Sequence, residues 1–210
     1  AKTLAAGLGC TFSRIQCTPD LLPSDVTGIS YFNQRSQEFE FRPGPIFGQI
    51  VLADEINRAT PRTQSAFLEA MAEGQVTAEG VRRSLPSPFL VVATQNPIEL
   101  EGTFPLPEAQ LDRFLLQAPM GYPSRDEEME IVARFSGEPL ASSTMPLVDE
   151  DQVRRLQRAC RQIHVSAPVA AYAVDIGRPP RSPAVLRLAA SPPPALTPLP
   201  SPPARDLLPR

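Results

Sequence analysis

The sequence predicts an α/β fold built around a parallel β-sheet, and two apolar runs separated by a helical pattern predict it. Residues 50–53 are uninterruptedly apolar, as is typical of a strand buried in a parallel sheet, and residues 89–93 form a second such run. Between the runs, Thr60 and Pro61 are typical of a helix start, and Gly74 of a helix end. The apolar face of this helix comprises Ala66, Phe67, Ala70 and Met71.

Two adjacent acids, Asp54 and Glu55, directly follow the first apolar run. A parallel strand ends at the carboxyl edge of its sheet, where open α/β sheets bind ligands. One carboxylate can hold Mg²⁺, directly or through water, and the other can orient or deprotonate an attacking water. The pair therefore indicates a nucleotide-hydrolysing site. The alternative is a strand that ends in two solvated acids, because four apolar residues before Asp-Glu is a common string.

Asn96 and Arg113 are the further candidate site residues. Asn96 follows the second apolar run, and its amide can bond both a phosphate and an attacking water, although Asn-Pro is also typical of a plain turn. Arg113 ends a short helical stretch, from which it could reach a phosphate on a neighbouring subunit. The alternative for Arg113 is a surface ion pair with Asp112 or Glu108, of little energetic value.

The remaining elements follow from local patterns. We expect the end of a helix over residues 1–9, a strand over 12–16, and hairpins over 26–41 and 75–85, with Val76 opposite Val81 in the second. Helices are expected after Ser124, Asp149 and Ser166, the last ending near residue 177. In the helix that begins after Asp149, the residues expected to be buried are Val153, Leu156, Cys160 and Ile163.

Several longer strings make the chain resemble the MoxR family of AAA+ ATPases over about residues 10–135. The strings that carry this resemblance lie at residues 9–16, 18–28, 41–46, 54–59, 96–99 and 102–109. The resemblance implies an AAA+ P-loop NTPase-like parallel sheet core with a partial all-α lid. It also implies ATP as substrate, Mg²⁺ as cofactor, and chaperone-like remodelling or maturation of partner proteins.

The resemblance also assigns roles to the four candidate residues. Asp54 corresponds to the Walker B residue for Mg²⁺, and Glu55 to the residue that polarises the attacking water. Asn96 corresponds to sensor 1, which places it with Asp54 and Glu55 among the nucleotide-binding residues. Arg113 corresponds to an arginine finger acting in trans, which implies a ring, commonly a hexamer. The sequence does not identify the client protein, and a von Willebrand A-domain protein is one candidate by resemblance.

Two stretches depart from the family pattern. No glycine-rich loop precedes Lys2, which also lies too close to Leu8-Gly9 to be the P-loop lysine. We therefore expect an N-terminally truncated core over residues 1–120, in a fragment that would not itself bind ATP with P-loop affinity. A partial lid is expected over residues 121–177. Residues 178–210 are proline-rich, with Pro193 where the family has its sensor 2 arginine, and are expected to be disordered or to reflect a frame error.

Composition narrows the function classes. The chain of 210 residues has 20 basic and 23 acidic residues, a net charge of −3, which gives no reason to expect nucleic acid as a partner. No apolar run is long enough to span a membrane, and three cysteines without CxxC spacing suggest reduced thiols in the cytoplasm. His164 is the single histidine and receives no role. A non-hydrolysing partner-binding module and a metal-chelatase-type AAA+ subunit remain the alternatives.

Overall fold

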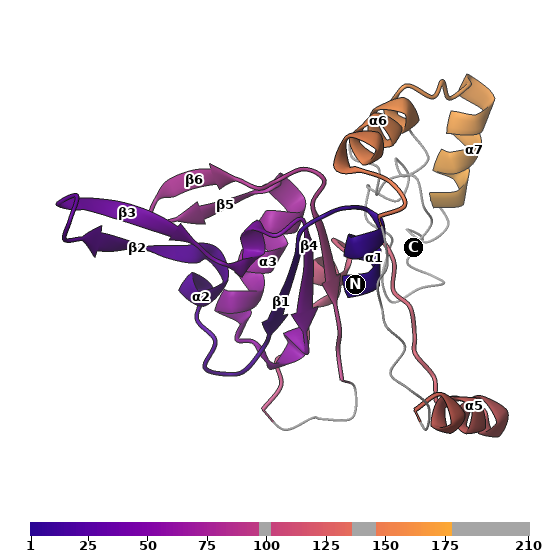
Figure 1. Ribbon diagram of the computed structural model, residues 1–210. Coiled ribbons are helices and arrows are strands. Elements are labelled where there is room, and N and C mark those ends of the chain that lie inside the picture. The colour runs from indigo at the N-terminus through magenta and orange to yellow at the C-terminus, as the bar shows by residue number, and fades with distance from the viewer. Residues whose placement is uncertain (97–101, 136–145, 178–210) are drawn as a thin grey trace.

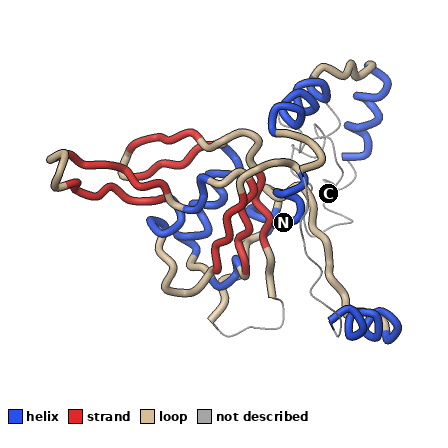
Figure 2. Tube along the Cα trace, viewed as in Figure 1, coloured by secondary structure: helices blue, strands red, loops and turns tan. Residues whose placement is uncertain are grey.

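A three-stranded parallel sheet forms the centre of the described molecule (Figures 1 and 2). The computed structural model describes residues 1–96, 102–135 and 146–177. The sheet has the order β1 (Phe12–Gln16), β4 (Ile50–Asp54) and β7 (Leu90–Ala93), so β4 is flanked on both sides. Gln16 is paired with Asp54, and Ala53 with Ala93, so all three strands end at one edge. The predicted α/β parallel sheet is confirmed.

The central strand is buried because a helix covers it. Val51 and Ala53 of β4 are completely buried and belong to one core cluster with Phe67, which is also fully buried. Phe67 lies on α3 (Pro61–Glu73), whose N-cap Thr60 accepts a hydrogen bond from the Thr63 amide. The helix ends at Gly74 in a left-handed conformation, as the sequence predicted.

Two antiparallel hairpins extend from this body (Figure 1). The first pairs β2 (Gly28–Asn33) with β3 (Glu38–Pro43), and the second pairs β5 (Gln75–Ala78) with β6 (Val81–Ser84). Both were predicted, but the expected pairing of Val76 with Val81 is wrong. Val81 faces Ala78, and Val76 faces Arg83, because Glu79 and Gly80 both take positive φ angles and form a two-residue turn.

Short helical turns connect these elements. They are α1 (Lys2–Gly7), α2 (Pro23–Thr27), the 3-10 turns η1 (Pro45–Phe47) and η2 (Ile56–Arg58), and α4 (Glu108–Leu111). The sequence predicted the end of a helix at α1 but no helix at α2. In α2 the helix is supported by Pro23 in its first turn and by the Asp25 carboxylate, which accepts a hydrogen bond from the Leu22 amide at 2.9 Å.

Three longer helices follow, namely α5 (Arg125–Phe135), α6 (Glu150–Arg161) and α7 (Ala167–Gly177). The starts of α5 and α6 were predicted, and both have capping boxes, Ser124 with Glu127 and Asp149 with Gln152. The predicted burial of the apolar face of α6 is wrong. The side chains of Leu156 and Ile163 are 62% and 58% exposed, and Val153 and Cys160 are only half-buried.

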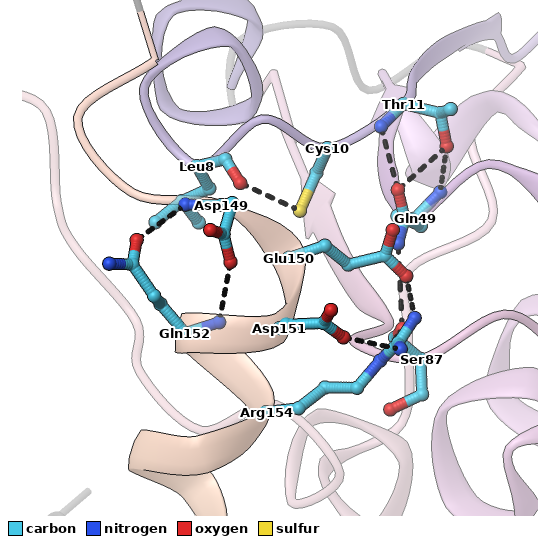
Figure 3. A network of polar contacts seen from close by, with 10 residues as sticks. All are labelled: Leu8, Cys10, Thr11, Gln49, Ser87, Asp149, Glu150, Asp151, Gln152 and Arg154. Atoms are coloured by element: carbon cyan, nitrogen blue, oxygen red, sulfur yellow. Dashed lines mark hydrogen bonds and ion pairs between the residues drawn. The ribbon is translucent and has the colours of Figure 1, made fainter.

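The contact of α6 with the sheet body is polar instead (Figure 3). Arg154 of α6 donates a hydrogen bond from Nε to the Ser87 carbonyl at 2.8 Å, and its guanidinium also pairs with Glu150 and Asp151. This polar contact does not cover Leu156 and Ile163, which stay exposed. In the described ranges no helix is long and apolar enough to cross a membrane. The proline-rich segment 178–210, including Pro193, lies outside the described residues.

Candidate functional site

The carboxylate of Asp54 lies at the carboxyl edge of the sheet and is bound by both neighbouring strands. Its Oδ1 accepts a hydrogen bond from the Thr94 hydroxyl at 2.5 Å, directly after β7. Its Oδ2 accepts one from Arg14 Nη2 on β1 at 2.6 Å. The Thr94 hydroxyl and then the Arg14 guanidinium hold the pKa of Asp54 below its usual value, so this carboxyl is ionised at neutral pH.

Glu55 has a left-handed backbone, with φ 54° and ψ 51°, which is uncommon for a residue with a side chain. Its amide donates to the Thr94 hydroxyl at 2.8 Å, and its Oε2 accepts hydrogen bonds from Gln16 at 3.3 Å and Arg58 at 3.4 Å. The neighbouring Ile56 amide donates to the Thr94 carbonyl at 3.0 Å. Contacts with β1, β7 and η2 therefore hold a strained turn and its carboxylate next to Asp54.

Asn96 lies two residues beyond Thr94, against the segment that follows Glu55. Its backbone amide donates to Asn57 Oδ1 at 3.4 Å, and its backbone carbonyl accepts from Asn57 Nδ2 at 3.2 Å. Asn57 belongs to η2 and is buried. The structure thus places the backbone of Asn96 at the same edge of the sheet as Asp54 and Glu55.

A buried glutamine supports the η2 segment from α3. Gln64 is 1% exposed, and its Nε2 donates to the carbonyls of Ile56 at 3.2 Å and Ala59 at 3.1 Å. It also contacts the Phe104 carbonyl at 2.8 Å. Since a buried amide that loses its partners is destabilising, these bonds fix the loop that carries Glu55 and Asn57 relative to α3.

Arg113 does not join the contacts around the two acids. It follows α4, is exposed overall, and donates from Nη1 to the Leu68 carbonyl of α3 at 3.2 Å. This bond differs from the surface ion pair with Asp112 or Glu108 considered from sequence. It uses one of the five donor N–H groups of the guanidinium.

The donor set at this edge fits Mg²⁺. Asp54 and Glu55 offer carboxylate oxygens, which are the hard ligands that this ion prefers. Among the described residues, no group of three or more His, Cys, Asp or Glu side chains could form a metal site. The two facts agree, because Mg²⁺ in nucleotide-hydrolysing sites is held by one or two carboxylates together with water and substrate phosphates.

Arg14, Gln16 and Thr94 also contribute to the site but were not predicted from the sequence, although a signal for each exists. Thr94 is the first polar residue after residues 89–93, as Asp54 is after residues 50–53, and the register of β4 with β7 sets these two residues side by side. Arg14 and Gln16 are two residues apart on β1, so they share one face of the strand. The missing information was which strands are neighbours.

Comparison with known proteins agrees with this geometry. Residues 1–116 match the model of the family described as "ATPase family associated with various cellular activities (AAA)". The chain therefore belongs to the AAA ATPases, and the fold class predicted from the resemblance is confirmed. Chaperone MoxR1 of Mycobacterium tuberculosis is 45% identical over 175 residues, which are 83% of this chain and 46% of that protein. Within the AAA ATPases, this chain is a member of the MoxR family.

Two further relatives support the same placement. Uncharacterized protein YeaC of Bacillus subtilis is 49% identical over 191 residues, which are 91% of this chain and 60% of that protein. The crystal structure of a protein from Cytophaga hutchinsonii, assigned as an ATPase, is 40% identical and superposes with a TM-score of 0.77. That match covers 87% of this chain and 56% of the other. The chain thus spans about half the length of the relatives it matches.

Proposed function

We propose that this chain contributes the water-activating edge of a Mg²⁺-dependent ATPase of the MoxR type. One observation carries the proposal, namely the meeting of Asp54, Glu55 and Thr94 at the carboxyl edge of a parallel sheet. Parallel strands of an open sheet direct their carboxyl ends toward a bound ligand. Family membership supports nucleotide as that ligand.

The roles of the side chains follow from their chemistry. Asp54 is ionised and held between two strands, so it presents a fixed negative charge to the cation that accompanies ATP. Glu55 orients the attacking water and accepts its proton, and its left-handed backbone is what turns it beside Asp54. Bound Mg²⁺ would neutralise charge that develops on the phosphate oxygens. Asn96, held through its backbone by Asn57, bonds the terminal phosphate and the water.

Arg113 supplies positive charge to a site on an adjacent subunit. Its exposure and its hydrogen bond to α3, away from the two acids, fit an arginine that acts outside its own subunit, and an arginine finger in trans requires a ring. The assembly would be a hexamer that uses ATP to remodel or mature a client protein, as the name of the Mycobacterium tuberculosis relative, a chaperone, suggests. A von Willebrand A-domain protein remains a candidate client.

Two substitutions in the complete gene product test this proposal. Glu55→Gln keeps size and hydrogen bonding but removes the charge that activates water, so ATP binding should persist while turnover falls by about a hundredfold or more. Asp54→Ala should instead weaken Mg·ATP binding. Nucleotide titration and phosphate release separate the two effects. Turnover near wild type in Glu55→Gln would contradict the role of Glu55, and absence of ATP binding in the wild type would favour a non-hydrolysing binding module.

A further inference from the structure

One hydroxyl group contacts both acids of the proposed site. Thr94 Oγ1 lies 2.5 Å from Asp54 Oδ1 and 2.8 Å from the Glu55 amide nitrogen. A hydroxyl has one donor proton and two acceptor lone pairs. Because the Glu55 amide can only donate, Thr94 accepts from it and uses its single proton for the Asp54 carboxylate. The direction of both hydrogen bonds is therefore fixed.

The backbone around Thr94 removes its freedom to move away. The Thr94 amide donates to the Ala53 carbonyl at 3.0 Å, and the Thr94 carbonyl accepts from the Ile56 amide at 3.0 Å. Thr94 thus bonds to each residue from Ala53 to Ile56, through its backbone or its hydroxyl. Such a residue can transmit the position of β7 to the turn that carries both carboxylates.

The turn needs this support because it is strained. Glu55 is a non-glycine residue with φ 54°, a conformation that surrounding contacts must maintain. The Thr94 hydroxyl is the partner of its amide, so its loss would leave that amide without its bond and would release the Asp54 carboxylate on one side. Gln16 and Arg14 of β1 and Arg58 of η2 would then be the remaining side chains that hold the acids.

We infer that Thr94 is a positioning residue for ATP hydrolysis, whose hydroxyl sets the Asp54 and Glu55 carboxylates relative to each other. The inference rests on the proposed function. It adds a residue that acts through the two acids, from the same tip of β7 that leads to Asn96. Because hydrolysis depends on the geometry of both carboxylates, the effect should fall on the rate of turnover more than on nucleotide affinity.

The test replaces the hydroxyl in the complete gene product. Thr94→Val keeps the shape of the side chain, and Thr94→Ser keeps the hydroxyl. Thr94→Val should lower kcat by about tenfold to a hundredfold, the range expected when a hydrogen bond to a charged group is lost, with KM for ATP within about threefold of wild type. Thr94→Ser should recover kcat to within about threefold.

A second readout does not depend on turnover. Mn²⁺ is titrated by electron paramagnetic resonance in the presence of a non-hydrolysable ATP analogue, and Thr94→Val should weaken Mn²⁺ binding while the affinity for the analogue stays unchanged. Thr77→Val is the matched control. The Thr77 hydroxyl, on the second hairpin, also donates to a carboxylate, that of Glu69 on α3, at 2.7 Å. The control variant should leave kcat and Mn²⁺ binding as in the wild type.

Distinct outcomes would overturn the inference. A Thr94→Val enzyme with wild-type kcat and Mn²⁺ binding would show that the hydroxyl positions nothing. A Thr94→Ser enzyme as slow as Thr94→Val would show that the methyl group matters instead, and equal loss of analogue binding would show a role in binding or folding. Failure of the proposed function looks different, because wild type and Glu55→Gln would then both lack turnover, and the inference would fall with it.

Discussion

Single residues at the sheet edge have properties that depend on their neighbours across the strands. Asp54 and Glu55 could be singled out from the sequence because two acids after an apolar run have a simple interpretation. The contacts of Thr94 and Arg14 could not, since they depend on the register of β7 and β1 with β4. A register is a long-range property that the pattern of one strand does not contain.

The buried thiol of Cys17 reports on this edge. Its side chain is fully buried and its amide donates to the Asp54 carbonyl at 2.9 Å. Burial, and then the negative charges of Asp54 and Glu55, raise the pKa of Cys17 from 9.0 to about 11. The folded state keeps the thiol protonated. The contribution of the protonated thiol to the free energy of unfolding is therefore complete below pH 9 and is lost as the pH rises toward 11.

We therefore predict that Cys17 destabilises the protein at alkaline pH. As the pH rises from 8 to 10.5, ionisation of Cys17 should lower the free energy of unfolding by about 1–2 kcal/mol. Urea denaturation at both pH values, for wild type and Cys17→Ala, measures this contribution as the difference between their pH dependences. Identical pH dependences for the two proteins would show that the thiol titrates normally.

At the scale of elements, local patterns predicted most of the helices and strands. Alternation, caps and glycines gave the positions of β1, both hairpins, α3 and the starts of α5 and α6. The pairing of Val76 failed because the turn lies at Glu79 and Gly80, which sets Ala78 rather than Val76 opposite Val81. The burial of the apolar face of α6 failed for another reason, since amphipathic spacing shows which residues share a face but not what covers that face.

The base of the first hairpin should be intolerant of side chains. Gly28 has φ +97°, and a Cβ there would meet the Arg42 carbonyl and lie 2.6 Å from the Gly44 amide nitrogen. Gly28→Ala should lower the free energy of unfolding by about 2–4 kcal/mol. The control is Gly74→Ala, also at positive φ but in open space, with an expected loss of about 1 kcal/mol. Denaturant titration compares them, and equal losses would contradict the proposed clash.

The contact between α6 and the sheet body should depend on Arg154. Its side chain is 41% exposed, so Arg154→Ala should change the global free energy of unfolding by less than about 1 kcal/mol. Amide hydrogen exchange over residues 150–161 should nevertheless accelerate, because the bond to Ser87 is lost. Arg155→Ala, at an exposed position on the same helix, is the control. Equal exchange rates in the two variants would show that Arg154 does not hold α6.

At the scale of the whole molecule, we propose that hydrolysis uses Asp54 and Glu55 of one subunit and Arg113 of the next. Within its own subunit, the Arg113 guanidinium donates to the Leu68 carbonyl, and the side chain is exposed. The Arg113→Ala and Glu55→Gln proteins should each be inactive alone, because every site in either ring lacks one component.

Mixing the two variants in the complete gene product tests this claim most directly. In randomly assembled rings from equal amounts, about a quarter of the interfaces would join an intact Glu55 to an intact Arg113, so ATP turnover should return to about that fraction of wild type. A mixture as inactive as its components would contradict the shared site and leave Arg113 with a role inside its own subunit. Activity of Arg113→Ala alone would remove Arg113 from the mechanism.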